Sequence, residues 1–222
     1  MEVFWRLLSH VWPVRLARYH GAFGPLEVAY EYGVKVLNTP NANQSHGSLH
    51  TIWQRVFRQV LNTEDPPTSV LLLGLGGGSV LKILRDERGI AAPITAVELD
   101  PAMVRIATDH FGLLGFPDVE VVIGDALAKL DEFAGPYDLV VVDVFVDDQV
   151  SPGMARPEII ERLMSLTSRG GHLLINTMDR GPEEARMSRQ LATTFERRNT
   201  AFKVLEPMDG NKVFWWRPVE QG

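Results

Sequence analysis

The sequence predicts an α/β fold: a mostly parallel, seven-stranded sheet with helices on both faces and a small N-terminal β-hairpin extension. Two observations support the sheet. From residue 70 onward, short apolar runs typical of buried strands alternate with segments of helical period, which is the pattern of a parallel sheet covered on both faces. Near the C-terminus, two apolar runs flank Asp209-Gly210-Asn211, a turn sequence typical of an antiparallel hairpin.

The individual elements follow from the same patterns. Apolar runs bounded by glycine, proline or polar residues predict parallel strands at about 70–73, 94–98, 119–123, 138–143 and 172–177. Apolar residues at helical spacing predict helices near 79–88, 101–111, 126–133, 156–168 and 182–197. The runs at 202–205 and 212–216 complete the sheet as its terminal hairpin.

The N-terminal part of the chain has a different character. Up to about residue 22, aromatic and aliphatic side chains lie among basic ones, and Pro13 rules out one continuous helix. We expect an arm that packs on the domain or on a second subunit, and exposed Trp5 and Trp12 would then favour a homodimer. A segment that contacts lipid or RNA is the alternative.

A hairpin and a helix follow this arm. Apolar residues alternate over 26–31 and 34–37, which predicts the hairpin, and residues 49–61 show a helical period. We therefore assign residues 1–62 to an N-terminal arm, hairpin and helix, and residues 63–222 to the α/β domain.

Composition excludes several functions. The chain has 222 residues, of which 45% are hydrophobic, enough for one domain with a full core. Cysteine is absent, which removes disulfides and thiolate chemistry and fits a cytoplasmic protein. A net charge of -6 argues against bulk nucleic-acid binding. No apolar run approaches the roughly 18 residues of a membrane span, and basic residues interrupt the N-terminus, so no signal peptide is expected.

A glycine loop separates the first parallel strand from the helix after it. Gly74, Gly76 and Gly78 would let the backbone approach a ligand without side-chain interference, and the following helix points its N–H groups toward that ligand. Three alternating glycines exceed what a turn needs. A dinucleotide fingerprint would place its last glycine at position 79, where this chain has Ser79.

Two acidic residues follow the next two strands. Glu98 ends the second strand, at the position where an acid accepts hydrogen bonds from a ribose diol. Asp100 directly precedes Pro101 and is the better cap for the next helix, which leaves Glu98 for the ligand. Asp125 follows the third strand and is either a ligand contact or a helix cap, or both.

These motifs, with Gly124-Asp125-Ala126 and the run from Tyr137 to Asp143, resemble the class I S-adenosylmethionine-dependent methyltransferase superfamily, and within it the spermidine synthase group. The resemblance covers about residues 25–180. It implies a Rossmann-like methyltransferase fold and a cofactor that is S-adenosylmethionine or its decarboxylated form. It also implies that Asp125, with Ala126 beside it, contacts the adenine amine, and that Gln44 lies where those synthases contact the cofactor.

Asp143 is the expected catalytic residue. It ends the fourth strand, on the side of the sheet where ligands bind. The resemblance implies that it orients and deprotonates the attacking amine. Those synthases continue this residue as D-x-x-D-P, whereas position 146 here is valine and no proline follows. Asp147 and Asp148 are the available substitutes and are our candidate substrate-binding residues.

A second departure concerns the cofactor. Gly77 stands where those synthases commonly carry an aspartate on the aminopropyl side of the pocket. Burying an ammonium group without a partner costs several kcal/mol, so the missing acids weaken the case for polyamine synthesis. We expect methyl transfer from S-adenosylmethionine to an unidentified small molecule or side chain. The alternatives are a polyamine aminopropyltransferase and a non-catalytic nucleoside-binding or assembly protein. His46 and His50 lack a third ligand, so no metal site is expected.

Overall fold

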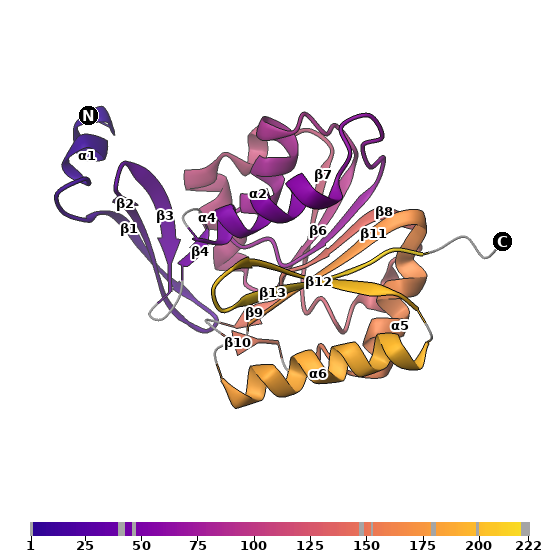
Figure 1. The fold of residues 1–222 in the computed structure, drawn as a ribbon. Coiled ribbons are helices and arrows are strands. Elements are labelled where there is room, and N and C mark those ends of the chain that lie inside the picture. The colour runs from indigo at the N-terminus through magenta and orange to yellow at the C-terminus, as the bar shows by residue number, and fades with distance from the viewer. Residues whose placement is uncertain are drawn as a thin grey trace.

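The computed structural model describes residues 2–39, 43–45, 48–146, 149–151, 153–178, 181–198 and 200–218. Its centre is a seven-stranded sheet of order β12-β13-β11-β8-β5-β6-β7 (Figure 1). The strands are β5 (Val70–Leu73), β6 (Ile94–Glu98), β7 (Val119–Ile123), β8 (Tyr137–Val142), β11 (Thr167–Met178), β12 (Phe202–Met208) and β13 (Asn211–Trp216). Only β13 runs against its neighbours. The predicted sheet and its terminal hairpin are therefore confirmed.

Helices cover both faces of this sheet (Figure 1). One layer contains α2 (Ser48–Val60), α3 (Ser79–Lys82) with the π-helix η1 (Ile83–Glu87), and α4 (Pro101–Phe111); the other contains α5 (Pro157–Leu166) and α6 (Pro182–Arg197). Successive residues of a strand point to opposite faces. Val70 and Leu72 accordingly pack in the core beneath α2, whereas Leu71 and Leu73 pack in the core beneath α5 and α6.

The predicted helix at 126–133 is wrong. The chain makes turns through residues 126–129, followed only by the short 3-10 helix η3 (Leu130–Glu132). Besides Ala126, the buried residues here are Leu127, Leu130 and Phe133, which are spaced by three. A spacing of three matches the 3-10 helix better than the 3.6-residue turn of an α-helix. A second short 3-10 helix, η2 (Leu113–Gly115), follows α4.

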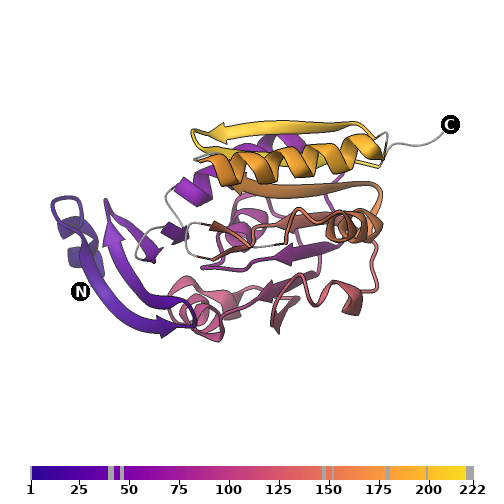
Figure 2. The same ribbon diagram turned by 90° about the horizontal axis from the view of Figure 1, so that it is seen from below.

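The N-terminal part folds into more than the expected hairpin. A short helix, α1 (Glu2–Leu8), ends before Pro13, as predicted. The strands β1 (Val14–Gly21), β2 (Gly24–Glu31), β3 (Val34–Asn38) and β4 (Asn43–Ser45) then form an antiparallel sheet in that order, which lies beside the α/β domain (Figure 2). Strand β1 was not predicted, because none of its residues is fully buried and its apolar alternation is weak.

The N-terminal sheet is anchored on α4. Leu26, Val28 and Leu37 pack against Met103 and Ile106 of that helix. The tip between β1 and β2 is held separately, because the backbone N–H of Ala22 donates to Asp100 Oδ2 at 2.7 Å. The tip therefore lies at the N-terminus of α4, and this helix begins shortly after Glu98 in the sequence.

A two-stranded ribbon follows β8, made of β9 (Phe145–Val146) and β10 (Gln149–Val150). Among the described helices, none combines the length and the apolar character needed to cross a lipid bilayer.

Candidate functional site

The sheet register brings the predicted landmarks to one edge. Gly74 N donates to Val97 O, and Gly124 N donates to Glu98 O, each at 2.9 Å. Asp143 N donates to Leu73 O at 2.7 Å. The chain leaves β5 toward β6 on one side, while β8 lies on the other side, so this edge contains the switch point where open α/β sheets bind ligands.

The glycines of the loop differ in what they make possible. Gly74 has φ +94°, and a Cβ built on it would overlap the carbonyl group of Asp143. Glycine is therefore needed there to let the ends of β5 and β8 come together. Gly78 has φ +84° and faces open space, and it precedes the first turn of α3. Gly76 has φ +52°. Gly74 and Gly76 line the crevice at this edge.

Glu98 is buried and holds the glycine loop. Its Oε2 accepts from Gly76 N at 2.9 Å and its Oε1 accepts from Asp100 N at 3.0 Å. Burial raises the pKa of this carboxyl above its ordinary value, and these backbone hydrogen bonds oppose that rise. A carboxylate can accept about four hydrogen bonds, so Glu98 retains capacity for a ligand hydroxyl.

Asp100 caps α4, as the sequence predicts. Its Oδ1 accepts from Ala102 N at 2.8 Å. Asp125 also caps a turn, since its Oδ1 accepts from Leu127 N at 2.9 Å. Among the described residues, hydrogen bonds reach Asp125 through Oδ1 and leave Oδ2 available. Ala126 is buried beside it and lines the same crevice. Asp125 is therefore both a turn cap and a wall of the crevice.

Asp143 is held between two donors that the sequence did not reveal. Trp53 Nε1, from α2, donates to its Oδ2, and Asn176 Nδ2, from β11, donates to its Oδ1, both at 2.8 Å. Burial raises the pKa of Asp143 to about 6, the two hydrogen bonds oppose this, and the charge of Glu98 adds to it. Asn176 interrupts the apolar run Leu173–Ile175 near the end of β11, and that was the one available sequence signal.

One atom beside Asp143 lacks a partner. Asn176 is only 2% exposed, and its Oδ1 has no hydrogen-bond partner within the described part of the chain. Buried acceptors are nearly always paired. The Asp143 end of β8 therefore offers an unused acceptor next to a carboxylate, which suits an N–H or O–H group from a bound molecule.

The crevice at this edge is narrow. A cavity of about 60 Å³ is lined by the landmark residues and by Leu99, Met103 and Phe145. An adjoining cavity of about 40 Å³ shares Glu98, Leu99, Met103 and Phe145 and is closed by residues 23–26 of the N-terminal sheet. Ligand pockets usually measure about 300–1,000 Å³. Binding of a nucleoside cofactor therefore requires Phe145 and its neighbours to move so that the two cavities join.

The chemistry of the lining nevertheless fits such a cofactor. Ribose hydroxyls and an adenine amine are hydrogen-bond donors, and Glu98 and Asp125 are acceptors at the corresponding places. Gln44 lies in β4, but its side chain is outside the described residues, as are Asp147 and Asp148. His50 Nε2 lies 2.6 Å from Glu87 Oε1. Within the described ranges, no three histidine, aspartate or glutamate side chains lie together in a way that could hold a metal ion.

Comparisons with known proteins identify the family. Residues 64–216 match the family model described as "Methyltransferase domain". The eEF1A lysine and N-terminal methyltransferase of Danio rerio is 29% identical over 130 residues, which are 54% of this chain but only 19% of that protein. The chain thus spans less than a fifth of the length of this relative.

Solved structures share the fold. A probable spermidine synthase from Corynebacterium glutamicum has a TM-score of 0.69 at 17% identity, covering 93% of this chain and 81% of the other. Human methyltransferase-like protein 13, solved in complex with SAH, has a TM-score of 0.62 at 21% identity, covering 79% and 84%. The chain belongs to the methyltransferase-domain family, and its fold is that of the class I S-adenosylmethionine-dependent methyltransferases.

Proposed function

We propose that this chain is a methyltransferase of the spermidine synthase-like group in which Asp143 receives the proton of the acceptor. The observation that carries the proposal is the position of this carboxylate, fixed by Trp53 and Asn176 at the edge of the sheet that also holds the glycine loop. The likeness to spermidine synthases concerns the fold, which extends over 93% of the chain and includes the N-terminal sheet.

In this proposal the cofactor lies along the crevice. Glu98 accepts hydrogen bonds from the ribose, Asp125 and Ala126 lie beside the adenine, and Gly76 lets the backbone approach the ligand, while a side chain on Gly78 would meet only open space. Gly74 contributes by letting β5 and β8 approach, and Gln44 is a further contact. When bound, S-adenosylmethionine supplies a methyl group activated by the positive charge on sulfur.

The chain contributes orientation and proton acceptance. Two N–H donors hold the Asp143 carboxylate in one orientation and favour its ionised form. Its pKa of about 6 keeps it mostly ionised at neutral pH, yet basic enough to take a proton from an attacking nitrogen or oxygen. The apolar side chains of Val144 and Phe145 line the same crevice and help to exclude water.

The loop favours the intact cofactor over its decarboxylated form. Decarboxylation exposes an amine, which needs an acidic partner, and Gly77 supplies none. The cavity at residues 23–26 is narrow, which fits a small molecule or one extended side chain as acceptor. A protein acceptor has support from the relative whose name gives eEF1A lysine as its target. Asp147 and Asp148 are the remaining candidates for acceptor binding.

Isothermal titration calorimetry with both cofactors tests the proposal. We expect the wild-type protein to bind S-adenosylmethionine more tightly than decarboxylated S-adenosylmethionine. Asp143→Asn should bind S-adenosylmethionine with unchanged affinity, because Asp143 acts on the acceptor rather than on the nucleoside. A preference of tenfold or more for the decarboxylated form would replace methyl transfer by aminopropyl transfer. Failure to bind either cofactor would leave only the non-catalytic alternative.

A further inference from the structure

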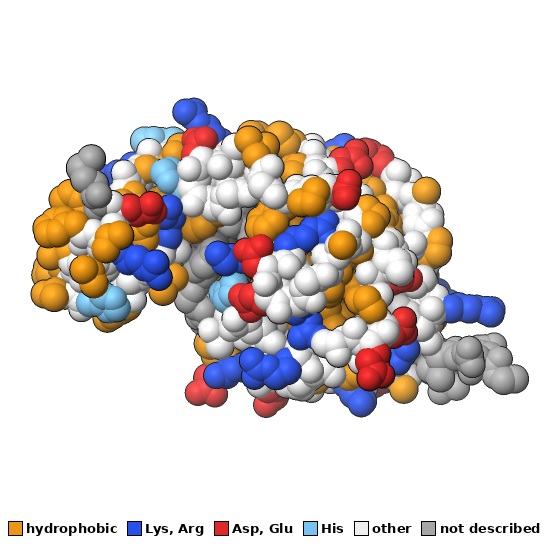
Figure 3. Space-filling view, turned by 90° about the horizontal axis from the view of Figure 1, so that it is seen from above, with side chains coloured by type: hydrophobic (Ala, Val, Ile, Leu, Met, Phe, Trp, Pro, Cys, Tyr) orange, Lys and Arg blue, Asp and Glu red, His pale blue; other side chains and the backbone are white. Residues whose placement is uncertain are grey.

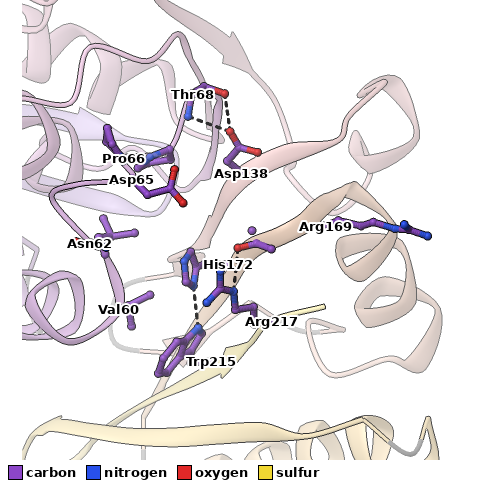
Figure 4. A pocket seen from close by; sticks show the side chains of 14 residues that line it. Val60, Asn62, Asp65, Pro66, Thr68, Asp138, Arg169, His172, Trp215 and Arg217 are labelled. Carbon is purple, nitrogen blue, oxygen red and sulfur yellow. Dashed lines mark hydrogen bonds between the residues drawn. The ribbon is translucent and has the colours of Figure 1, made fainter. Parts of the chain in front are cut away.

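A larger pocket lies at the opposite ends of the parallel strands, where these strands begin. It has a volume of about 370 Å³ and is formed where β5 and β8 begin, with walls from the end of α2, from β11 and from β13 (Figure 4). Strand β5 has four residues, so this edge is roughly 13 Å from the cofactor edge at about 3.3 Å per residue. The pocket is thus separate from the site around Asp143.

An irregularity in β11 shapes this pocket. The pairing of β11 with β8 breaks between Thr167 and His172. Ser168 Oγ donates to Asp138 Oδ1 at 2.6 Å, and a Cβ on Gly171 would lie 2.8 Å from the carbonyl oxygen of Asp138. Bulges of this kind redirect side chains and often lie next to functional sites. Here the bulge makes the wall of the hollow.

His172 is fixed as a hydrogen-bond donor. The indole Nε1 of Trp215, which can only donate, lies 3.0 Å from His172 Nδ1. Nδ1 must therefore be the acceptor, and the proton of the neutral ring resides on Nε2. In Figure 4 the ring stands in the pocket with its other nitrogen turned away from Trp215 and toward Asp65. Burial, reinforced by the charge of Arg217, lowers the pKa of His172 to about 4, so the ring is neutral at physiological pH.

The pocket also contains one oriented cation and one available carboxylate. Arg217 Nε donates to Gly170 O at 2.9 Å, which leaves its two terminal nitrogens to face the pocket. Asp138 is occupied, since Thr68 and Ser168 donate to its two oxygens. Asp65 forms no ion pair with any residue that the structure describes, and its carboxylate points into the pocket (Figure 4). Arg169 also lines the pocket, but its guanidinium end extends away from it (Figure 4).

We propose that this pocket binds a free α-amino acid with an apolar side chain. Its carboxylate would accept from Arg217 and from His172 Nε2, its ammonium would face Asp65, and its side chain would lie against the apolar lining residues Val60 and Pro66. A simple anion would meet the charges of Asp65 and Asp138, and a simple cation would meet Arg217. A zwitterion matches both signs of charge at once. We therefore propose a zwitterionic ligand rather than a simple anion or a simple cation.

Indole resonances provide a test with an internal control. L-Phenylalanine is titrated into the isotope-labelled full chain, with N-acetyl-L-phenylalanine and L-phenylalaninamide as probes that each lack one charge. We expect a saturable shift of the Trp215 indole N–H with the free amino acid, and at least tenfold weaker binding of both derivatives. The Trp53 indole, which reports on Asp143, should not move; S-adenosylmethionine should shift Trp53 and leave Trp215 unchanged.

Two matched variants complete the experiment. Arg217→Gln should weaken binding of L-phenylalanine at least tenfold, whereas Arg169→Gln should leave it unchanged, because Arg169 points away. Each variant is shown to be folded if S-adenosylmethionine shifts its Trp53 indole resonance by the same amount as in the wild-type protein. The proposal is overturned if Trp215 does not shift at millimolar L-phenylalanine, if the derivatives bind as well as the amino acid, or if the two variants behave alike.

Discussion

At the scale of single residues, Asp143 combines burial with two donors that favour its charge. Burial alone would neutralise the carboxyl, whereas Trp53 and Asn176 stabilise the ionised form. The result is a base with a pKa of about 6, well above the ordinary value for aspartate. Such a group accepts a proton more readily than an exposed aspartate does, yet is ionised at pH 7.

Replacing this base should abolish transfer without abolishing cofactor binding. We expect Asp143→Asn to lower the rate by about 10²- to 10⁴-fold, the usual range for a general base. The assay follows labelled methyl groups from S-adenosylmethionine to an acceptor found in a screen of amines, hydroxyl compounds and peptides. The same assay on wild type should lose activity as the pH falls through about 6, because the carboxylate becomes protonated. Full activity of the asparagine variant would contradict this role.

Trp53→Phe should raise the pKa of Asp143 further. The variant removes a hydrogen bond to the ionised form, so the carboxyl binds its proton more tightly. The titration midpoint is read from the side-chain amide resonances of Asn176, which contacts the other carboxylate oxygen. Trp216→Phe is the matched control, since the Trp216 indole donates to Thr200 instead, and it should leave the midpoint in place. Equal midpoints for wild type and Trp53→Phe would show that the contact does not tune Asp143.

At the scale of elements, the turn after β5 depends on one glycine. Gly74→Ala should destabilise the protein by several kcal/mol. The new Cβ would overlap the backbone of Asp143, and the alanine would have to adopt a positive φ. Gly89→Ala is the control: it also has a positive φ, at +64°, but nothing lies within 4 Å, so about 1 kcal/mol is expected. Urea unfolding measures both, and similar losses would contradict the close approach of β5 and β8.

Sequence patterns predicted elements well where one face or both were buried. The parallel strands and α2, α4 and α6 carry clear apolar periods. The alternation in β1 is too weak to predict a strand, and the spacing of three over residues 127–133 was mistaken for the period of an α-helix. The site residues were likewise predicted only in part. Gly74, Glu98, Asp125 and Asp143 could be grouped because parallel strands end at a common edge, whereas Trp53 reaches Asp143 only through the packing of α2.

At the scale of the whole molecule, the N-terminal arm leaves apolar surface exposed. Figure 3 shows hydrophobic side chains gathered at that end of the molecule. The exposed large hydrophobic residues of α1 and the turn after it are Val3, Phe4, Trp5, Leu7, Leu8, Val11 and Trp12. An apolar patch of this kind is often an interface, and a second copy turned by a two-fold axis would cover it with the same patch. Dimerisation through the arm therefore stays our prediction.

Sedimentation velocity tests the dimer. The wild-type protein should sediment as a species of twice the 24.8 kDa chain mass. The double variant Phe4→Ser, Trp12→Ser should sediment as a monomer, because it removes two large exposed side chains without touching the core. Leu114→Ser, a similarly exposed residue far from the arm in sequence, should stay dimeric. A monomeric wild type at micromolar concentration would contradict the prediction.

A crystal structure with S-adenosylhomocysteine tests the central claim most directly. The account predicts the nucleoside at the carboxyl edge of β5, β6 and β7, with its ribose hydroxyls hydrogen-bonded to Glu98, its adenine beside Asp125, and Phe145 displaced from the crevice. Density for the nucleoside away from Glu98, or a crevice still filled by Phe145 at saturating ligand, would contradict it.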